Sequence, residues 1–414
     1  MLSRRDFVKG AALVSIGTTA SSLLKGTLAF AAQHPEELAV PNNGKTLILV
    51  QLAGGNDGLN TVIPLNDSTY HSVRKVIGIA DGEALPLSAG FGLAPQLSGL
   101  KGLWDRGHLA VVRGVGYPNQ NYSHFKSMAI WQSADPELKL QEGWLGRTLD
   151  QLEAAHDPFL GFNIGGSTPP EMRSDHVSVP SVSSPADYGF RFGGKITPAT
   201  DPRVATIVKL YEQYPAQSPY GVLLETTAES AVSSASQLAS VAATYKPAVE
   251  YPKTSLASGL SVLAEAVVGN LGMRVGHITL GGFDTHTKEV AEHATLMTTL
   301  DEGLTAFYND LAAHGKADDV LVLTWSEFGR RVQENANGGT DHGSASMVFA
   351  LGNGVQQGLY GDQPSLTRLV DNGNLSFTTD FRSVYATVIE RWLGVPSTPL
   401  LGQAWPQLGF LKSA

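Results

Sequence analysis

The chain of 414 residues contains no cysteine. This absence excludes disulfide bonds, thiolate metal ligands, a cysteine nucleophile and lipid attachment through cysteine. An excess of positive charge is also missing, because 38 acidic and 29 basic residues give a formal net charge of −9. Since nucleic-acid-binding domains usually carry a basic patch, we expect no nucleic acid partner. The length suffices for one large α/β domain or for two smaller ones.

The first 31 residues predict a twin-arginine export signal. Arg4 and Arg5 precede a weakly apolar segment, and Ala29 and Ala31 form a small-x-small cleavage pattern. The segment is too short and too rich in Ser, Thr and Gly for a permanent membrane span. We therefore expect a mature chain that begins near Ala32, has the twin-arginine translocation machinery as a partner, and is periplasmic or secreted. The alternative is an ordinary exposed basic N-terminus.

The mature chain alternates short apolar runs with helical patterns. Five runs predict strands buried on both faces, and they begin near Lys45, His108, His277, Val320 and Met347. Helical patterns cover residues 202–214, 255–274, 288–314 and 381–393. The alternation predicts an α/β fold with a mostly parallel central sheet and helices on both faces. We expect a linker at 32–44 and a single domain at 45–414, with a loop-rich insertion near 155–250.

Acidic residues follow three of the predicted strands. Asp57, Asp284 and Glu327 each come after an apolar run, and Ser123 comes after a fourth. The carboxyl ends of parallel strands meet at one edge of a sheet, where ligands bind in open α/β folds. Carboxylates crowded at such an edge repel each other, and a metal cation is the simplest compensation. The pattern predicts a divalent metal site, with Zn²⁺, Mn²⁺, Mg²⁺ and Ca²⁺ all suited to a carboxylate-rich ligand set.

Each further candidate also has an ordinary structural interpretation. Asp284 and His286 can point into one cleft, although an Asp before a helix is often an N-cap. His342 lies in a Gly-rich loop that lets the backbone approach a ligand closely. Ser123 precedes a predicted helix as either a cap or a nucleophile. Arg330 either binds an anionic group through two hydrogen bonds or faces solvent.

Several motifs in a fixed order resemble an exported family known as domain of unknown function 1501. They include GGNDGLN (54–60), YSHFKSM (122–128), GGFDTHT (281–287), SEFGRR (326–331) and GGTDHGS (338–344). That family is similar, more distantly, to the alkaline phosphatase and sulfatase superfamily. The resemblance implies two metal ions, one held by Asp57, Glu327 and Ser123. The other ion would be held by Asp284, His286 and His342.

The same resemblance implies an exported metal-dependent hydrolase that acts on a small anionic ester, either a phosphate or a sulfate. One departure is Glu327-Phe328, which stands where the superfamily usually has Asp-His after the fourth strand. A sulfatase that uses formylglycine is not expected, because the chain has no cysteine and STPPEMR does not fit C/S-x-P-x-R. The alternative is a non-catalytic exported binding protein that retains the fold with a degenerate metal site.

Overall fold

A computed structural model describes residues 43–152, 157–182 and 233–413, together with residues 202, 203, 206 and 209. The predicted export signal and almost all of the predicted linker lie outside the described residues. Half of the predicted insertion and most of the predicted helix at 202–214 also lie outside them. Within the described ranges, no helix is both long enough and apolar enough to cross a membrane.

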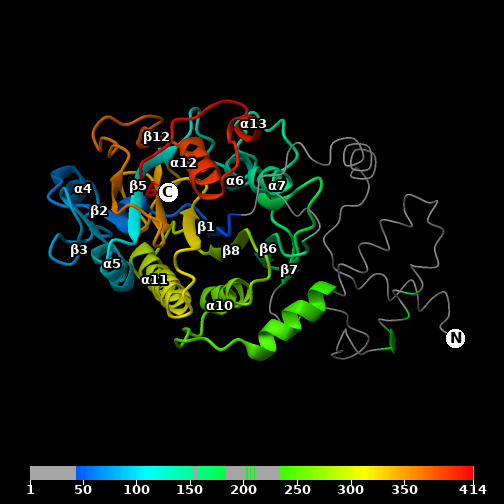
Figure 1. Cartoon of the computed structure of the whole chain (residues 1–414). Helices are drawn as coiled ribbons and strands as arrows, with labels where there is room; N and C mark the ends of the chain where they lie inside the picture. Colours follow the sequence, from blue (N-terminus) through cyan, green and yellow to red (C-terminus); the bar gives the residue numbers. More distant parts are fainter. Residues whose placement is uncertain are drawn as a thin grey trace.

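A nine-stranded sheet lies at the centre of the described structure (Figure 1). Its strands are β1 (Thr46–Ala53), β5 (Leu109–Gly116), β6 (Gly161–Ile164), β7 (Ser181–Val182), β8 (Val275–Gly281), β9 (Val320–Trp325), β10 (Ser346–Leu351), β11 (Gly358–Tyr360) and β12 (Thr379–Asp380). The order is β11-β5-β10-β9-β1-β8-β6-β7, and β12 pairs with β5. All of these pairings are parallel except those of β10, which runs antiparallel to β5 and β9. The mostly parallel sheet and its five predicted strands are therefore confirmed.

Helices cover both faces of this sheet (Figure 1). One face carries α5 (Ser98–Asp105), α10 (Ser255–Val268) and α11 (Glu289–Ala313). The other carries α6 (His124–Ser133), α7 (Trp144–Asp150), α12 (Phe381–Thr387), a π-helical turn (Val388–Trp392) and α13 (Thr398–Leu401). Shorter elements are α3 (Gly58–Thr61), α4 (Ser68–Val73), a 3₁₀ turn (Pro170–Met172) and a small sheet of β2 (Val62–Pro64), β3 (Leu85–Pro86) and β4 (Phe91–Leu93).

Strand β1 shows why apolar residues occupy successive positions of its sequence from Leu47 to Val50. Ile48, Val50 and Leu52 pack into the core on the α10 and α11 face, and all are nearly inaccessible to solvent. Leu47 and Leu49 point the opposite way, into the core beneath α6, α7 and α12. Successive side chains of a strand alternate between faces, so a strand covered on both sides needs apolar residues at every position.

The strands that precede the predicted site residues end at one edge of the sheet. Ala53 at the end of β1 is in register with Gly281 at the end of β8. Gln51 is in register with Trp325, the last residue of β9. The loops that follow these strands therefore begin side by side, as the parallel arrangement requires.

Candidate metal centre

Asp284 lies in the loop that follows β8, and its side chain is 48% exposed. The end of β1 packs directly against this loop, because Gly54 has a φ of +121° and lies against the backbone of Phe283 and Asp284. A side chain at position 54 would both strain the backbone and overlap the amide of Asp284. The glycine-rich turn after β1 thus brings two strand ends together at the site.

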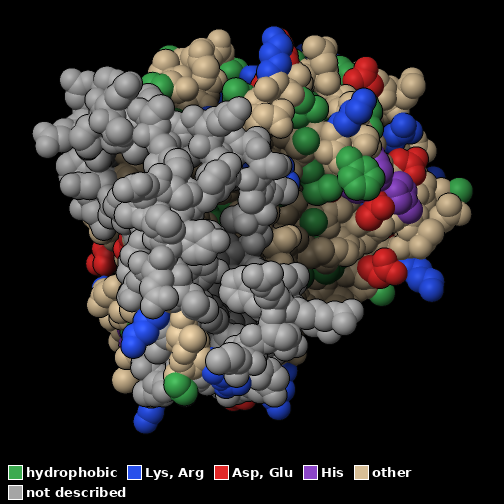
Figure 2. Space-filling model, turned by 90° about the vertical axis from the view of Figure 1, so that its right-hand side faces the viewer, with side chains coloured by type: hydrophobic (Ala, Val, Ile, Leu, Met, Phe, Trp, Pro, Cys, Tyr) green, Lys and Arg blue, Asp and Glu red, His purple; other side chains and the backbone are tan. Residues whose placement is uncertain are grey.

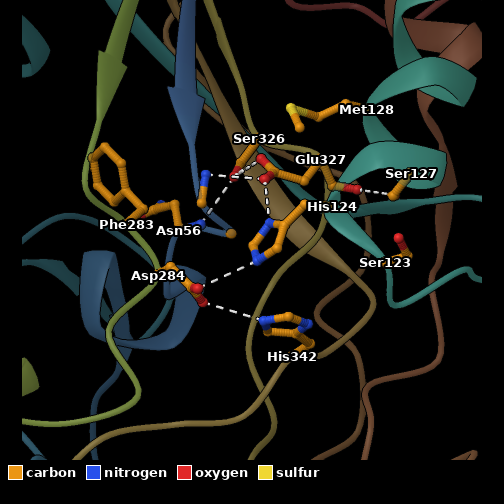
Figure 3. A network of polar contacts seen from close by, with 12 residues as sticks. Asn56, Ser123, His124, Ser127, Met128, Phe283, Asp284, Ser326, Glu327 and His342 are labelled. Atoms are coloured by element: carbon orange, nitrogen blue, oxygen red, sulfur yellow. Dashed lines mark hydrogen bonds and ion pairs between the residues drawn. The ribbon is translucent and has the colours of Figure 1, made fainter.

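Three imidazole nitrogens converge on the carboxylate of Asp284. The Nε2 atoms of His286 and His342 each lie 3.1 Å from Asp284 Oδ1. The Nε2 atom of His124 lies 3.4 Å from the other oxygen, Oδ2. His286 Nε2 and His342 Nε2 are only 3.0 Å apart. Figure 3 shows Asp284 between His124, which comes from α6, and His342, which comes from the loop before β10.

The opposite nitrogen of each ring faces an oxygen atom that can accept a hydrogen bond. The Nδ1–oxygen pairs are His342 with the Tyr122 carbonyl at 2.8 Å, His124 with Glu327 Oε1 at 2.8 Å, and His286 with Asp341 Oδ1 at 3.3 Å. Carbonyl and carboxylate oxygens accept hydrogen bonds, so a neutral imidazole carries its proton on Nδ1 here. The three Nε2 lone pairs then all point toward Asp284. Metal-binding histidines are typically oriented in this way.

The spacing of these atoms fits a cation. Asp284 Oδ1, His286 Nε2 and His342 Nε2 form a triangle with sides of 3.0 to 3.1 Å. Bonds of about 2.0–2.1 Å to a transition metal place neighbouring ligand atoms about 2.8–3.0 Å apart in octahedral geometry and about 3.3–3.4 Å apart in tetrahedral geometry. Asp284, His124 and His342 also each offer a possible ligand atom within 4.8 Å of the others. The structure thus brings together Asp284, His286 and His342, as the sequence predicted.

Glu327 does not offer its carboxylate to this triangle. It is fully buried, and its Oε1 accepts hydrogen bonds from the Gly54 amide at 2.9 Å and from His124 Nδ1 at 2.8 Å. Its Oε2 accepts from the Ser326 hydroxyl at 3.4 Å (Figure 3). The acid at the end of β9 therefore orients His124, and the role of Glu327 as a direct metal ligand stays a prediction.

Asp57 belongs to a separate, closed group of side chains. Its carboxylate caps α3 by accepting from the amides of Leu59 and Asn60, and it also pairs with the buried guanidinium of Arg74. Burial opposes the charge of Asp57, but Arg74 and Glu289 outweigh it and hold the pKa of this carboxyl well below its usual range. Asp57 is thus compensated by an arginine, and its role as a metal ligand stays a prediction.

Two more titratable side chains are buried around Asp57. Burial, reinforced by the neighbouring Asp57 carboxylate, raises the pKa of Glu289 to about 9, and Thr340 donates a hydrogen bond to it at 2.6 Å. Burial also lowers the pKa of His293 to about 4, and its Nε2 lies 3.1 Å from Asn56 Oδ1. Near neutral pH this closed group therefore holds a carboxylate, a guanidinium, a protonated carboxyl and a neutral imidazole.

Arg330 contacts Asp284, but its side chain is fully buried. Its guanidinium donates to Asp284 Oδ1 at 2.8 Å and to the backbone carbonyls of Gly54, Gly55, Phe283 and Thr340. Burial tends to raise the pKa of Asp284, but the bond and charge of Arg330 lower it to about 2. Arg330 therefore fixes the Asp284 loop, and its role in binding an anionic group during catalysis stays a prediction. Arg331 is the more accessible of the two, with 40% of its side chain exposed.

Ser123 lies at the expected place but apart from the convergent histidines. It is the N-cap residue of α6, and its exposed side chain makes no capping hydrogen bond. In Figure 3 its hydroxyl is separated from Asp284 by His124 and the chain around Glu327. The described contacts therefore do not support Ser123 as a ligand of the ion at Asp284.

His124 is the site residue that the sequence analysis did not identify. It is the first residue of α6, directly after Ser123, and its half-buried side chain contacts Asp284, Glu327 and His342. Its Nε2 is buried and has no hydrogen bond partner. The sequence does hold a signal for His124, because it stands at the first helical position after a predicted buried strand. That position lies at the same sheet edge as the other candidates.

Several solved structures are similar in fold. They include a PsFucS1 sulfatase from Pseudoalteromonas sp. (12% identity, 100% of this chain and 77% of that chain, TM-score 0.40). A protein in the alkaline phosphatase superfamily from Vibrio parahaemolyticus matches at 9% identity over 88% of this chain and 70% of that chain, with a TM-score of 0.37. The lipoteichoic acid synthase LtaP from Listeria monocytogenes matches at 11% identity over 89% and 74%, with a TM-score of 0.35. Scores this low do not transfer a reaction to this chain.

No curated protein matches the chain. A family model does match, over residues 110–400, and it is described as a protein of unknown function, DUF1501. This match covers α6, β8, β9 and the loop before β10, and hence every residue that converges on Asp284. The chain belongs to the DUF1501 family.

Proposed function

We propose that the protein is an exported, metal-dependent hydrolase of phosphate or sulfate esters. The observation that carries this proposal is the convergence of three Nε2 atoms on one carboxylate, two of them 3.0 Å apart. Two imidazole lone pairs that face each other at this distance repel unless a proton or a cation lies between them. A shared divalent cation satisfies both rings and the carboxylate at once.

Asp284, His286 and His342 are the residues that would hold this cation. Two imidazoles and one carboxylate suit Zn²⁺ or Fe²⁺, and also Mn²⁺, better than Mg²⁺ or Ca²⁺, which prefer all-oxygen ligands. This narrows the metals expected from the sequence. It also supports one ion at this place, because Asp57 and Glu327 are engaged elsewhere. The cation would polarise the ester and offset negative charge that develops during its cleavage.

His124 and Glu327 are placed to move a proton. Glu327 holds the Nδ1 side of His124, so that Nε2 faces the oxygen of Asp284 that lies outside the triangle. In the proposed reaction, a water oxygen bonds to phosphorus or sulfur while the bond to the ester oxygen breaks. His124 Nε2 accepts the proton of the water and returns it to the departing alcohol. Water is the proposed nucleophile because the Ser123 hydroxyl makes no contact with these groups.

Two substitutions separate the roles of these histidines. We expect His342→Ala to lose both the bound metal and turnover of a generic ester such as 4-nitrophenyl phosphate. We expect His124→Ala to retain the metal and lose turnover by about 10²–10⁴-fold, the usual contribution of a positioned acid–base group. His71→Ala is the matched control, because His71 pairs with Asp81 away from the site. Full turnover in the metal-free protein would refute the proposal.

A non-catalytic metal-binding protein is the second candidate. The observation in its favour is Ser123, whose exposed hydroxyl makes no capping hydrogen bond and lies apart from the convergent histidines, so no side-chain nucleophile is held at the ion. The same assays decide between the two candidates, since a protein of this kind would bind the ion and turn over neither phosphate nor sulfate esters.

Export is the other part of the proposal, and the N-terminal sequence alone supports it. Arg4 and Arg5 precede an apolar segment and a cleavage pattern. Replacing both with lysine should leave a folded precursor inside the cell, detected by fractionation and immunoblotting. Undiminished export of that variant would contradict the twin-arginine pathway.

A further inference from the structure

Strand β8 extends further toward the site than its neighbour β6. The register between β1 and β8 continues to Ala53 and Gly281, whereas that between β6 and β8 stops at Ile164 and Ile278. The last three residues of β8, 279–281, therefore have a strand partner on only one side. The residues Val275 to Ile278 are buried, but Thr279 and Gly281 are exposed, although β8 is an interior strand of the sheet.

These exposed positions lie on the α6 face of the sheet, next to the convergent histidines. Alternate residues of paired strands share a face, so Thr279 and Gly281 lie on the face of Gln51 and Ala53. The Thr279 hydroxyl donates to Gln51 Oε1 at 3.1 Å, and Gln51 Nε2 contacts Met128 Sδ at 3.5 Å. Met128 lies one turn after His124 in α6. We call Gln51, Met128, Thr279 and Gly281 the β8 strip.

The β8 strip is also close to the site along the sheet. Gly281 lies beside Ala53, one strand spacing of about 4.8 Å away. The next residue, Gly54, donates its amide to Glu327, which in turn holds His124. Figure 3 shows Met128 near Glu327, and Figure 2 shows exposed histidine side chains with acidic and hydrophobic side chains around them.

Neither packing nor backbone geometry demands a glycine at position 281. Among the described residues, no atom lies within 4 Å of a Cβ built there, and the φ of Gly281 is not in the left-handed region. Glycine in a strand interior lowers stability, and one use of it is to let a ligand approach the backbone closely. As far as the described residues go, the space over Gly281 is therefore open on the α6 face of the sheet.

We infer that the β8 strip is the subsite for the organic part of the ester, and that this part is a neutral, hydroxylated group such as a sugar or polyol. The inference rests on the proposed function of the neighbouring site. The strip offers the exposed hydroxyl of Thr279 and the strand edge of residues 279–281, which pairs with no described strand on the β6 side, and both exchange hydrogen bonds with alcohols. Gln51 is buried and holds the Thr279 hydroxyl in place. All four side chains are uncharged, so a second charged group on the ligand would find no counter-ion within the strip.

The test is Gly281→Leu, which fills the open space without displacing any neighbour within 4 Å. Glucose 6-phosphate is the hydroxylated probe and methyl phosphate the probe without an organic ring. We expect KM for glucose 6-phosphate to rise at least 10-fold, while kcat/KM for methyl phosphate stays within twofold. Gly102→Leu is the matched control, because Gly102 on α5 also has no atom within 4 Å of an added Cβ and lies far from the strip in sequence and on the opposite face.

Calorimetric binding to the metal-loaded protein separates failure of this inference from failure of the proposed function. If glucose 6-phosphate binds more tightly than methyl phosphate and Gly281→Leu removes the difference, the subsite stands even when no ester is hydrolysed. If both probes bind equally, or Gly281→Leu and Gly102→Leu behave alike, the subsite is refuted. That second outcome leaves the hydrolase proposal intact wherever methyl phosphate is still turned over.

Discussion

Two groups of acidic and imidazole side chains lie at the same edge of the sheet, and they differ in how their charges are balanced. In the closed group, Asp57 pairs with Arg74, and both side chains are at most 1% exposed. In the open group around Asp284, the carboxylate is 48% exposed and three histidines direct Nε2 atoms at it. In the closed group, the protein itself supplies the positive charge that balances Asp57. In the open group, the carboxylate and the imidazole nitrogens direct unshared electron pairs at one place.

The difference shows that a carboxylate at a strand end is not in itself evidence of a metal site. A guanidinium supplies positive charge permanently and fills the space that an ion would need. Neutral imidazoles supply lone pairs and no charge, so a carboxylate among them still requires a cation or protons. The identity of the neighbours, rather than the acid itself, therefore separates a structural group from a binding site.

The largest expected loss of stability comes from removing the arginine of the closed group. Arg74→Met would leave Asp57 buried without its counter-ion, and removing one partner of a buried ion pair typically destabilises a protein by about 3–5 kcal/mol. Denaturant unfolding of the metal-free protein measures this change. His342→Ala, in the open group, should change the same free energy by less than about 1 kcal/mol. Similar losses for both variants would remove the distinction between the two groups.

The next largest expected effect is a change of stability with pH, which Glu289 of the closed group should cause. The pKa of Glu289 is raised from 4.5 to about 9, so its contribution to stability is fully present below pH 4.5 and is lost as the pH rises toward 9. Glu289→Gln cannot ionise, and its stability relative to wild type should increase between pH 5 and pH 8, by at most about 1.4 kcal/mol per pH unit. Urea unfolding of both proteins at these two pH values provides the measurement. A relative stability independent of pH would show that Glu289 is already ionised in the folded protein.

Protonation of His293, which belongs to the same closed group, should destabilise the protein at acidic pH. Its pKa is lowered from 6.5 to about 4 by burial, so the stability that it contributes is present above pH 6.5 and is lost as the pH falls through 4. Titration of the His293 ring in NMR spectra checks this expectation. A ring that titrates near pH 6.5 in the folded protein would mean that the closed group is accessible to water.

The smallest expected effect is a loss of turnover when the partner of His124 in the open group is changed. Glu327→Gln replaces the charged acceptor that orients His124, and loss of such an orienting partner typically lowers activity or metal affinity by about 10–100-fold. Because His124 is proposed as the proton-transfer residue, turnover should fall by this factor while metal content stays unchanged. Loss of the metal instead would place His124 among the ligands, and an unchanged rate would remove it from the reaction.

The sequence predicts the framework well because a buried sheet imposes a local pattern. The mainly apolar runs at β1, β5, β8, β9 and β10 reflect burial on both faces over most of their length, and they identify the strands without knowledge of their neighbours. The antiparallel direction of β10 is not visible in such a run, since it depends on how the chain returns to the sheet. The short strands β11 and β12 pair only with β5 and have too few residues to show a period.

The candidate site could be predicted only in part, because its residues are distinguished by contacts distant in sequence. Asp284, His286 and His342 lie in loops at the correct edge and were found from their position. Asp57 looks the same in sequence, and only the fold reveals that Arg74 turns back onto it from α4. His124 was missed because the adjacent Ser123 offered a familiar role, whereas the partner of His124, Glu327, lies 203 residues away.

Metal binding by the wild-type protein is the measurement that tests the central claim most directly. The metal-free protein, titrated with Zn²⁺ and separately with Mn²⁺, should bind one ion per chain, as read by calorimetry and by elemental analysis after gel filtration. The ion should also raise the melting temperature, because a ligand at 100 times its Kd stabilises the folded state by about 2.7 kcal/mol. His342→Ala should lose both effects, whereas His71→Ala should keep them. Binding of no ion by the wild type, or equal binding by wild type and His342→Ala, would contradict the account and leave Asp284 as a carboxylate paired with protonated histidines.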